Sequence, residues 1–299
     1  MHLQLPDIDF EKYLDQNEMH RQKVQSPKDF FDGAYDRVIN GLSVQGDALP
    51  WSKTHEHFRF RGGEITIWAG VNGNGKSLVM GQAAVWLDSP VVIASMEMLP
   101  EATLARMLRQ CSGVSSPSRD FSEAIVDKLH GKLWIYNQVG NVEQKALFGM
   151  IQYVATELEV KHVMIDSLVK CGLGTDDYNA QKHFVDRLTT LAKDLNIHIH
   201  LVVHMRKQSS EQHMPDKNSI KGAGEITDLA DNVIIISRKI VENGEDAPSD
   251  EEPTGFIRIA KQRHGEFEGT FAFWFHAPSQ QWIPTRRSQP MPWMTWSRK

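Results

Sequence analysis

A glycine-rich segment at residues 70–77, GVNGNGKS, constrains this chain more than any other part of its sequence. It fits the pattern GxxxxGK[ST] and lies between an apolar run, ITIWA, and a helical pattern, LVMGQAAVWL. In this pattern the glycines let backbone N–H groups surround phosphates at the start of a helix, where the helix dipole favours negative charge. The segment therefore predicts a strand, a nucleotide-binding loop and a helix in succession.

The whole loop is the predicted binding site for the phosphates of ATP. Its residues are Gly70, Val71, Asn72, Gly73, Asn74, Gly75, Lys76 and Ser77. We expect the Lys76 ammonium to bind the β and γ phosphates and the Ser77 hydroxyl to bind Mg²⁺.

Short apolar runs alternate with helical patterns along the rest of the chain. The predicted strands after the loop are VVIAS, LWIY, HVMID, IHIHLVVH and NVIIIS, and the predicted helices run to Trp86 and from about Glu101, Glu143 and Asn179. Such alternation is typical of a mostly parallel, twisted sheet flanked by helices. FIRIAK at 256–261 and TFAFWFH at 270–276 predict a C-terminal β-hairpin extension of this α/β fold.

Polar side chains follow three of the predicted strands. Asp166 ends HVMID, Glu97 follows VVIAS, and His204 ends IHIHLVVH. Because ligands bind at the carboxyl ends of the strands in open α/β sheets, we expect these groups beside the loop. Asp166 would hold the water shell of Mg²⁺, Glu97 would orient the attacking water, and His204 would contact the γ phosphate. His198 and His200 are assigned to ordinary strand positions.

Composition and charge exclude other classes of protein. Thirty-three Lys and Arg against 38 Asp and Glu give a formal charge of -5, which argues against a protein that coats nucleic acid over its whole surface. Cys111 and Cys171 lack CxxC spacing, so no zinc ribbon, iron–sulfur cluster or disulfide framework is expected. With no apolar run of about eighteen residues and an acidic N-terminus, we expect no membrane contact and a cytoplasmic location.

The ordered set of motifs resembles the RecA-like core of superfamily 4 replicative DNA helicases. The similarity rests on GVNGNGKS, ASMEM, HVMIDS, LVVHMRK, SIKGAGEITDLADNVIII and AKQRHGEFEGTFAFWF, from about Gly62 to Trp282. The chain resembles the DnaB C-terminal domain and, more closely, Twinkle and the helicase domain of phage primase-helicases. The resemblance implies a RecA-like P-loop ATPase. The compact core and the missing targeting peptide favour a protein that acts in a bacterial cytosol or in that of a phage-infected host.

The resemblance assigns roles to individual residues. Glu97 matches the family's catalytic glutamate, Asp166 its magnesium-binding acid and His204 its γ-phosphate sensor. Lys261 and Arg263 match the basic pair that these helicases insert into the ATP site of the neighbouring subunit, where a guanidinium stabilises developing charge. Arg238 lies where the phage enzymes carry an arginine that stacks on adenine.

The polar stretch between His204 and Gly224 is the predicted contact with single-stranded DNA. Loops at this position line the central channel in the family, and cations and amides suit a phosphate backbone. The residues assigned to DNA are Arg206, Lys207, Lys217, Asn218, Lys221 and Gly222. Charges on an exposed loop can also serve solubility alone.

The sequence divides into four segments. Residues 1–25 are expected to be a mobile arm, residues 26–60 a linker helix and connection, residues 61–283 the ATPase core, and residues 284–299 a basic tail with tryptophans. The apolar face of the helix can dock on the core or on a neighbouring subunit. The tail can contact DNA or a partner, or pack on the core.

These inferences predict an ATP-dependent helicase in DNA replication. We expect a hexameric ring without primase regions on single-stranded DNA, with Mg²⁺ as cofactor and primase, polymerase or single-strand-binding protein as candidate partners. The resemblance implies movement from 5′ to 3′. Two alternatives stay open: a recombinase-like filament ATPase on single-stranded DNA, and a helicase loader or adaptor gated by nucleotide.

Overall fold

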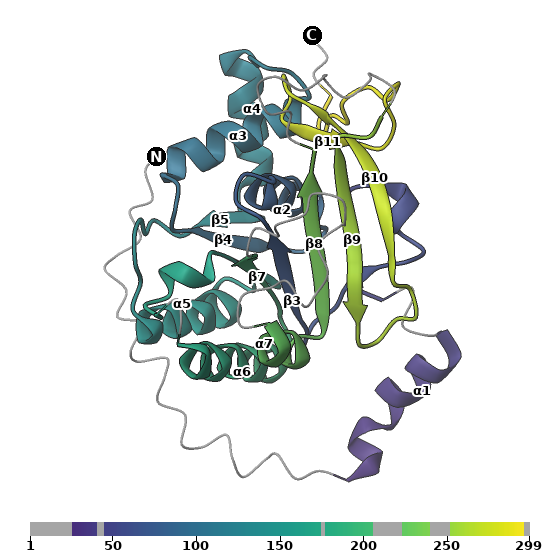
Figure 1. Ribbon diagram of the computed structural model, residues 1–299, viewed down its shortest axis with the longest axis vertical. Helices are drawn as coiled ribbons and strands as arrows, with labels where there is room; N and C mark the ends of the chain where they lie inside the picture. Colours follow the sequence, from purple (N-terminus) through teal and green to yellow (C-terminus); the bar gives the residue numbers. More distant parts are fainter. Residues whose placement is uncertain (1–25, 41–44, 175–176, 206–222, 240–251, 296–299) are drawn as a thin grey trace.

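The computed structural model describes residues 26–295, apart from residues 41–44, 175–176, 206–222 and 240–251 (Figure 1). At its centre is a nine-stranded sheet with the order β11-β10-β9-β8-β3-β7-β6-β4-β5. The strands from β8 to β5 in this order are parallel, and β9, β10 and β11 continue the sheet in antiparallel fashion. The predicted mostly parallel sheet with an antiparallel extension is therefore confirmed.

The strands follow the apolar runs of the sequence closely. Those of the main sheet are β3 (Ile65–Gly70), β4 (Val91–Ser95), β5 (Leu133–Ile135), β6 (His162–Asp166), β7 (His198–His204), β8 (Asn232–Arg238), β9 (Gly255–Gln262), β10 (Gly269–His276) and β11 (Gln281–Ile283). A separate two-stranded sheet pairs β1 (Asp47–Ala48) with β2 (Arg59–Phe60).

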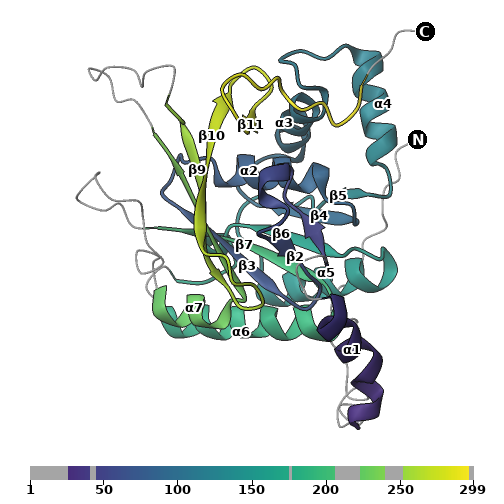
Figure 2. The same ribbon diagram turned by 90° about the vertical axis from the view of Figure 1, so that its right-hand side faces the viewer.

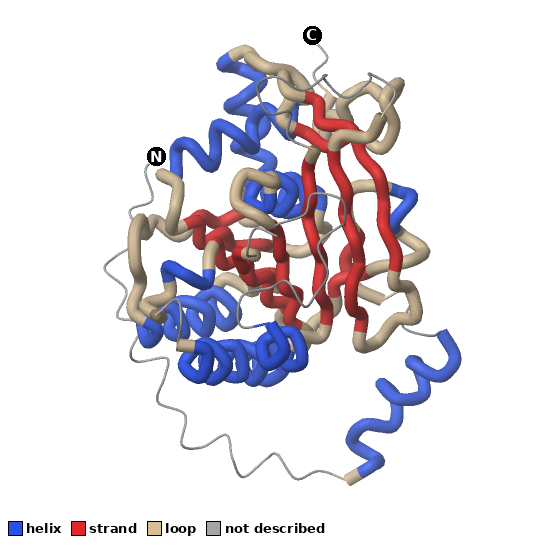
Figure 3. Tube along the Cα trace, in the orientation of Figure 1, coloured by secondary structure: helices blue, strands red, loops and turns tan. Residues whose placement is uncertain are grey.

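Helices cover both faces of the sheet, as Figure 3 shows in blue against the red strands. They are α1 (Phe31–Asn40), α2 (Lys76–Trp86), α3 (Pro100–Ser112), α4 (Arg119–Leu129), α5 (Gln144–Glu157), α6 (Tyr178–Leu195) and α7 (Ala223–Leu229), with short 3-10 turns at Pro27–Phe30, Ser52–Thr54 and Leu168–Lys170. Among the described residues, no helix is long and apolar enough to span a membrane.

Alternate residues of each central strand pack into different cores. Ile65, Ile67 and Ala69 of β3 face a cluster that includes α5 and α6, whereas Trp68 faces a second cluster that includes α2 and α3. Successive side chains of a strand point to opposite faces, so a strand covered on both sides must be apolar throughout. This explains why the parallel strands read as continuous apolar runs.

The packed core begins before the residue 61 expected from sequence. Leu49, Trp51 and Phe58 are buried in the same cluster as α2. The Trp51 indole donates a hydrogen bond of 2.7 Å to the Trp282 carbonyl, to which Gln82 Nε2 of α2 also donates at 3.1 Å. Packing therefore extends the core to the segment that starts at Asp47.

The described part of the tail packs on the core. The Trp293 backbone N–H donates to the Cys111 carbonyl at 2.9 Å. Its indole ring lies 4.4 Å from the Lys128 ammonium and 5.2 Å from that of Lys132. Cation–π contacts and backbone bonding therefore hold the tail against α3 and α4.

Helix α1 exposes its apolar residues and stands apart from the sheet and its covering helices in both Figure 1 and Figure 2. Ser26 and Asp29 form a capping box, in which the Ser26 backbone N–H donates to Asp29 Oδ2 at 2.7 Å. The exposed fractions of Phe31, Tyr35 and Val38 are 61%, 57% and 79%. This apolar face is uncovered in a single chain.

Three buried histidines lie side by side on the sheet, and two of them, His162 and His200, are joined by a hydrogen bond. The Trp68 indole donates to His200 Nδ1 at 3.1 Å, which leaves the hydrogen of a neutral His200 on Nε2. His200 Nε2 lies 3.1 Å from His162 Nδ1, and His162 Nε2 lies 2.7 Å from Asp47 Oδ2. Each nitrogen therefore has a fitting partner when both rings are neutral.

His198 lies beside this pair, with its ring centroid 4.5 Å from that of His200, and bonds to other partners in its neutral form. Its Nδ1 donates to the Arg61 carbonyl at 2.7 Å, and its Nε2 accepts from the Thr66 hydroxyl at 2.8 Å. Thr66 Oγ1 accepts in turn from Asn232 Nδ2 at 3.2 Å. Burial disfavours a second proton on this ring and so lowers the pKa of His198.

We expect folding stability to fall as the pH drops below about 6.5. Burial lowers the pKa of both His198 and His200 well below its ordinary value, so the unfolded chain takes up protons that the folded chain does not. Each histidine then costs about 1.4 kcal/mol of stability per pH unit between its unfolded and folded pKa. Urea unfolding between about pH 8 and pH 5.5 measures this slope.

Comparing the original chain with the variant His200→Gln separates the contribution of His200 to the pH dependence from that of other titrating groups. Burial raises the pKa of Glu64 and of Asp166, and both carboxyl groups act with the opposite sign. These contributions are shared by the variant, so its slope should be smaller than that of the original chain by about 1.4 kcal/mol per pH unit. Equal slopes would contradict a neutral His200.

Candidate active site

The glycine-rich loop joins the end of β3 to the start of α2, as predicted. Gly75 has a φ of 85°, in the left-handed region that favours glycine. A Cβ on Gly70 would lie 2.4 Å from the Ile236 carbonyl oxygen of the neighbouring strand β8. These two positions of the motif therefore require glycine for backbone reasons alone.

Lys76 lies folded into the loop. Its side chain is buried, and its Nζ donates to the Gly70 and Val71 carbonyls at 2.8 and 3.1 Å. Burial lowers the pKa of Lys76, and the nearby charges of Asp166 and Glu97 oppose that shift. The two carbonyls therefore hold the ammonium inside the loop.

Asp166 lies at the end of β6 beside the loop and is 3% exposed. Burial raises its pKa, while a hydrogen bond with Ser77 and the charges of Lys76 and Arg106 act in the opposite direction. Ser77 and Asp166 also border a cavity of about 20 Å³, which has room for a single water. The carboxylate of Asp166, from β6, and the hydroxyl of Ser77, from α2, thus meet at the start of α2.

Arg106 is a residue of this site that the sequence analysis missed. It lies on α3 and borders both the small cavity and the main pocket. Thr103, one turn earlier, borders the same cavity, and its buried Oγ1 has no hydrogen-bond partner among the described residues. Arginine on an amphipathic helix reads as a surface charge, so only the packing of α3 against α2 reveals its position.

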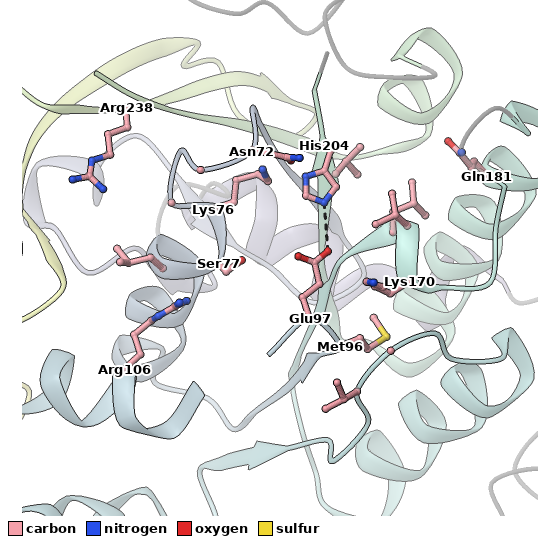
Figure 4. Close-up of a pocket in the computed structure, with 18 residues that line it drawn as sticks. Asn72, Lys76, Ser77, Met96, Glu97, Arg106, Lys170, Gln181, His204 and Arg238 are labelled. Atoms are coloured by element: carbon pink, nitrogen blue, oxygen red, sulfur yellow. Dashed lines mark ion pairs between the residues drawn. The ribbon is translucent and has the colours of Figure 1, made fainter. Parts of the chain in front are cut away.

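Glu97 and His204 meet on the other side of the loop. Figure 4 shows their side chains pointing toward each other, with His204 Nε2 3.6 Å from Glu97 Oε1. Ser167 lies between them: its Oγ donates to Glu97 Oε1 at 2.7 Å and is 3.2 Å from His204 Nε2. The sequence analysis gave Ser167 no role.

The predicted groups surround one open pocket of about 1020 Å³. Asn72, Lys76, Ser77, Glu97, His204 and Arg238 line it. Figure 4 places Arg238 and Arg106 on the opposite side of the loop from His204. The Arg238 guanidinium lies 4.1 Å from the centre of the Phe275 ring, and burial lowers the pKa of this arginine. The glycine-rich loop, Glu97, His204 and Arg238 are therefore brought together around one pocket.

The pocket lies at the carboxyl ends of the parallel strands, whereas Lys261 and Arg263 lie near their amino ends. Because β9 is antiparallel to β8, its end pairs with Asn232 at the start of β8. Lys261 Nζ donates to the Thr227 carbonyl at 2.8 Å, and Arg263 Nη2 donates to the Asp228 carbonyl at 3.0 Å. Both cations thus hold the C-terminal carbonyls of α7 and cannot reach the pocket of their own chain.

The residues assigned to DNA lie outside the described part of the chain. They are Arg206, Lys207, Lys217, Asn218, Lys221 and Gly222. Within the described residues, no group of three or more His, Cys, Asp or Glu side chains could hold a metal ion.

One family model and two solved structures are similar to this chain. The model of the DnaB-like helicase C-terminal domain matches residues 58–282. Two solved structures share the fold at 15% sequence identity, and each alignment covers 87% of this chain. One is a DnaB-like replicative helicase described with its interactions with primase, at a TM-score of 0.70 over 67% of that chain. The other is the ATPase domain of a second protein, at a TM-score of 0.73 over 99% of that chain.

Proposed function

Because the chain belongs to the DnaB-like helicase C-terminal domain family, we propose that it forms a hexameric ring that moves 5′ to 3′ along single-stranded DNA. As a member of this family it is a replicative helicase ATPase, an enzyme that binds and hydrolyses ATP. The family thus gives the reaction, and the proposal concerns how this chain carries it out.

The observation that supports the proposal is the meeting of loop, acid and histidine in one pocket. Lys76 would bind the β and γ phosphates once it leaves the loop carbonyls. Glu97 would orient the attacking water, and His204 would donate a hydrogen bond to the γ phosphate. The pocket is open, so ATP and water can enter it from solvent.

Ser77 and Asp166 fit the requirements of Mg²⁺. This ion keeps several of its waters and takes only one or two protein oxygens beside the phosphates. Ser77 also lines the open pocket of about 1020 Å³, where the ion would keep its waters and meet the phosphates, and Asp166 would accept from one of those waters. Bound Mg²⁺ would neutralise charge on the β and γ phosphates.

Arg238 would bind the adenine base. Phe275 occupies one face of its guanidinium, so a base stacks on the other face. Its position across the loop from His204 is consistent with a nucleotide that extends from base to γ phosphate between them.

Lys261 and Arg263 would act on the ATP of a neighbouring subunit. Their distance from their own pocket, across the sheet, leaves a second copy of the chain as the recipient. The segment 206–222 would line the central channel and bind the DNA backbone through its cations and amides. Primase, polymerase and single-strand-binding protein are the partners that a replicative ring would meet.

The face of α1 would join subunits. Apolar side chains of this size are seldom exposed together without a partner surface. We therefore assign residues 26–46 to a linker that docks on the next subunit, and residues from Asp47 to 283 to the ATPase core.

The double variant Phe31→Glu, Tyr35→Glu tests the ring. Two charges in the apolar face should convert hexamers into monomers, measured by light scattering after gel filtration and by negative-stain images with ATP and single-stranded DNA. Lys28→Glu is the matched control, because this exposed residue lies on the preceding 3-10 turn and should leave the ring intact. Unwinding of forked duplexes with either a 5′ or a 3′ tail tests the direction.

The same images separate the alternatives. A helical filament on DNA would favour the recombinase-like reading, and monomers whose binding to a partner depends on ATP would favour a loader. If the original chain forms rings and the double variant still forms them, the proposed role of α1 is contradicted but the ring is not.

A further inference from the structure

Ser167 is positioned to join the two groups that face the γ phosphate in the proposed reaction. Its side chain is fully buried. The Oγ atom is 2.7 Å from Glu97 Oε1 and 3.2 Å from His204 Nε2. Glu97 comes from the segment after β4 and His204 from the end of β7, so a residue between them can fix their relative position.

The hydrogens of this group follow from its chemistry. An ionised carboxylate only accepts hydrogen bonds, so the single hydrogen of the Ser167 hydroxyl points to Glu97. The Oγ lone pairs then face His204, and Nε2 must carry a hydrogen to bond with them. Ser167 thereby selects the form of His204 that presents an N–H donor at Nε2.

An N–H donor is what the γ phosphate needs from a sensor, because phosphate oxygens accept hydrogen bonds. The same Nε2–H can serve either Ser167 or a phosphate oxygen. Ser167 meanwhile binds only Oε1 of Glu97, which leaves Oε2 for a water molecule. Figure 4 shows the Glu97 carboxylate at the pocket, directly below the imidazole.

We propose that Ser167 is a positioning residue that couples His204 to Glu97: it holds the carboxylate in place for the attacking water and prepares the imidazole to bind the γ phosphate. This inference rests on the proposed function of the pocket. It adds a residue that neither the family match nor the sequence motifs single out.

The backbone of Ser167 has separate structural roles. Its carbonyl accepts from the Lys170 N–H at 2.9 Å and from Cys171 Sγ at 3.6 Å. Neither contact involves the hydroxyl, so Ser167→Ala keeps them and removes only the link between Glu97 and His204. Ser167→Cys keeps the size of the side chain but is a much weaker donor.

Steady-state ATPase with single-stranded DNA tests the coupling. We expect kcat to fall roughly ten- to hundredfold in Ser167→Ala and Ser167→Cys, as for a lost hydrogen bond to a charged group, with the KM for ATP nearly unchanged. In a His204→Asn background, Ser167→Ala should lower kcat less than about twofold, because the coupled partner is already absent. Ser112→Ala is the control: this buried serine of α3 donates only to backbone carbonyls and should not change kcat.

Nitrogen-15 NMR of the histidines without nucleotide gives a readout independent of turnover. His204, assigned by its loss in His204→Asn, should carry its hydrogen on Nε2 in the original chain, and this signal should shift in Ser167→Ala. An unshifted signal, an unchanged kcat or equal losses in both backgrounds would overturn the role of Ser167. An original chain without ATPase activity would instead contradict the proposed function.

Discussion

Glu97→Gln is expected to lower kcat for ATP by about 10²- to 10⁴-fold while ATP still binds. The amide keeps the size of the side chain, and its oxygen can still accept from Ser167. It cannot take a proton or attract one from the attacking water, so the loss falls on the chemical step. Turnover measured with saturating ATP and single-stranded DNA, beside the Kd of a fluorescent ATP analogue, separates the two effects.

Glu101→Gln is the matched control for this prediction. Glu101 lies in the first turn of α3, four residues after Glu97, and is exposed. It should retain the original kcat. A Glu97→Gln variant with kcat within tenfold of the original would show that another group orients the water.

Arg263→Ala is expected to lower kcat by about 10³- to 10⁵-fold, as loss of an arginine supplied by a neighbour does in related reactions. Within its own chain, Arg263 Nε also lies 3.1 Å from Asp231 Oδ1, so the variant loses an ion pair as well. Arg263→Lys keeps a positive charge near Asp231 but lacks the planar guanidinium. Both variants should lose hydrolysis, and thermal melting shows whether the fold is retained.

Mixed rings test whether Arg263 acts on the neighbour. A Glu97→Gln subunit keeps Arg263, and an Arg263→Ala subunit keeps its own Glu97, so a mixture should recover activity at interfaces that combine the two. Arg258→Ala, on the same strand β9, is the control and should hydrolyse ATP alone. Mixtures that stay inactive at every ratio would contradict action in trans.

Much of the fold could be predicted because the parallel strands are buried on both faces. Ile65, Ile67 and Trp68 belong to one continuous apolar run, and the loop after it is set by glycines at fixed spacing. Other elements lack such signals. Strand β11 has only three residues, too few for a pattern, and α4 was not expected although its N-cap Ser118 accepts from the Phe121 N–H.

The site could be predicted where a residue belongs to the glycine-rich loop or lies at or just after the carboxyl end of a strand. Asp166 and His204 end β6 and β7, so the parallel sheet brings them to one edge. Ser167 and Arg106 carry no comparable signal, since their roles depend on which side chain lies opposite them in space. The hydrogen bonds of His162 and His200 were equally hidden, because their partners come from other strands and from the distant residue Asp47.

The bonds around Trp282 have a mechanical consequence. Trp51 and Gln82 donate to the same Trp282 carbonyl, and the Trp282 N–H donates to Gln82 Oε1 at 2.8 Å. Trp51 follows the linker by a few residues, and Gln82 belongs to α2, the helix that begins at the phosphate loop. In the proposed ring, a pull on the linker would therefore reach α2, and with it the nucleotide site, through these buried hydrogen bonds as well as through the contact of Asp47 with His162.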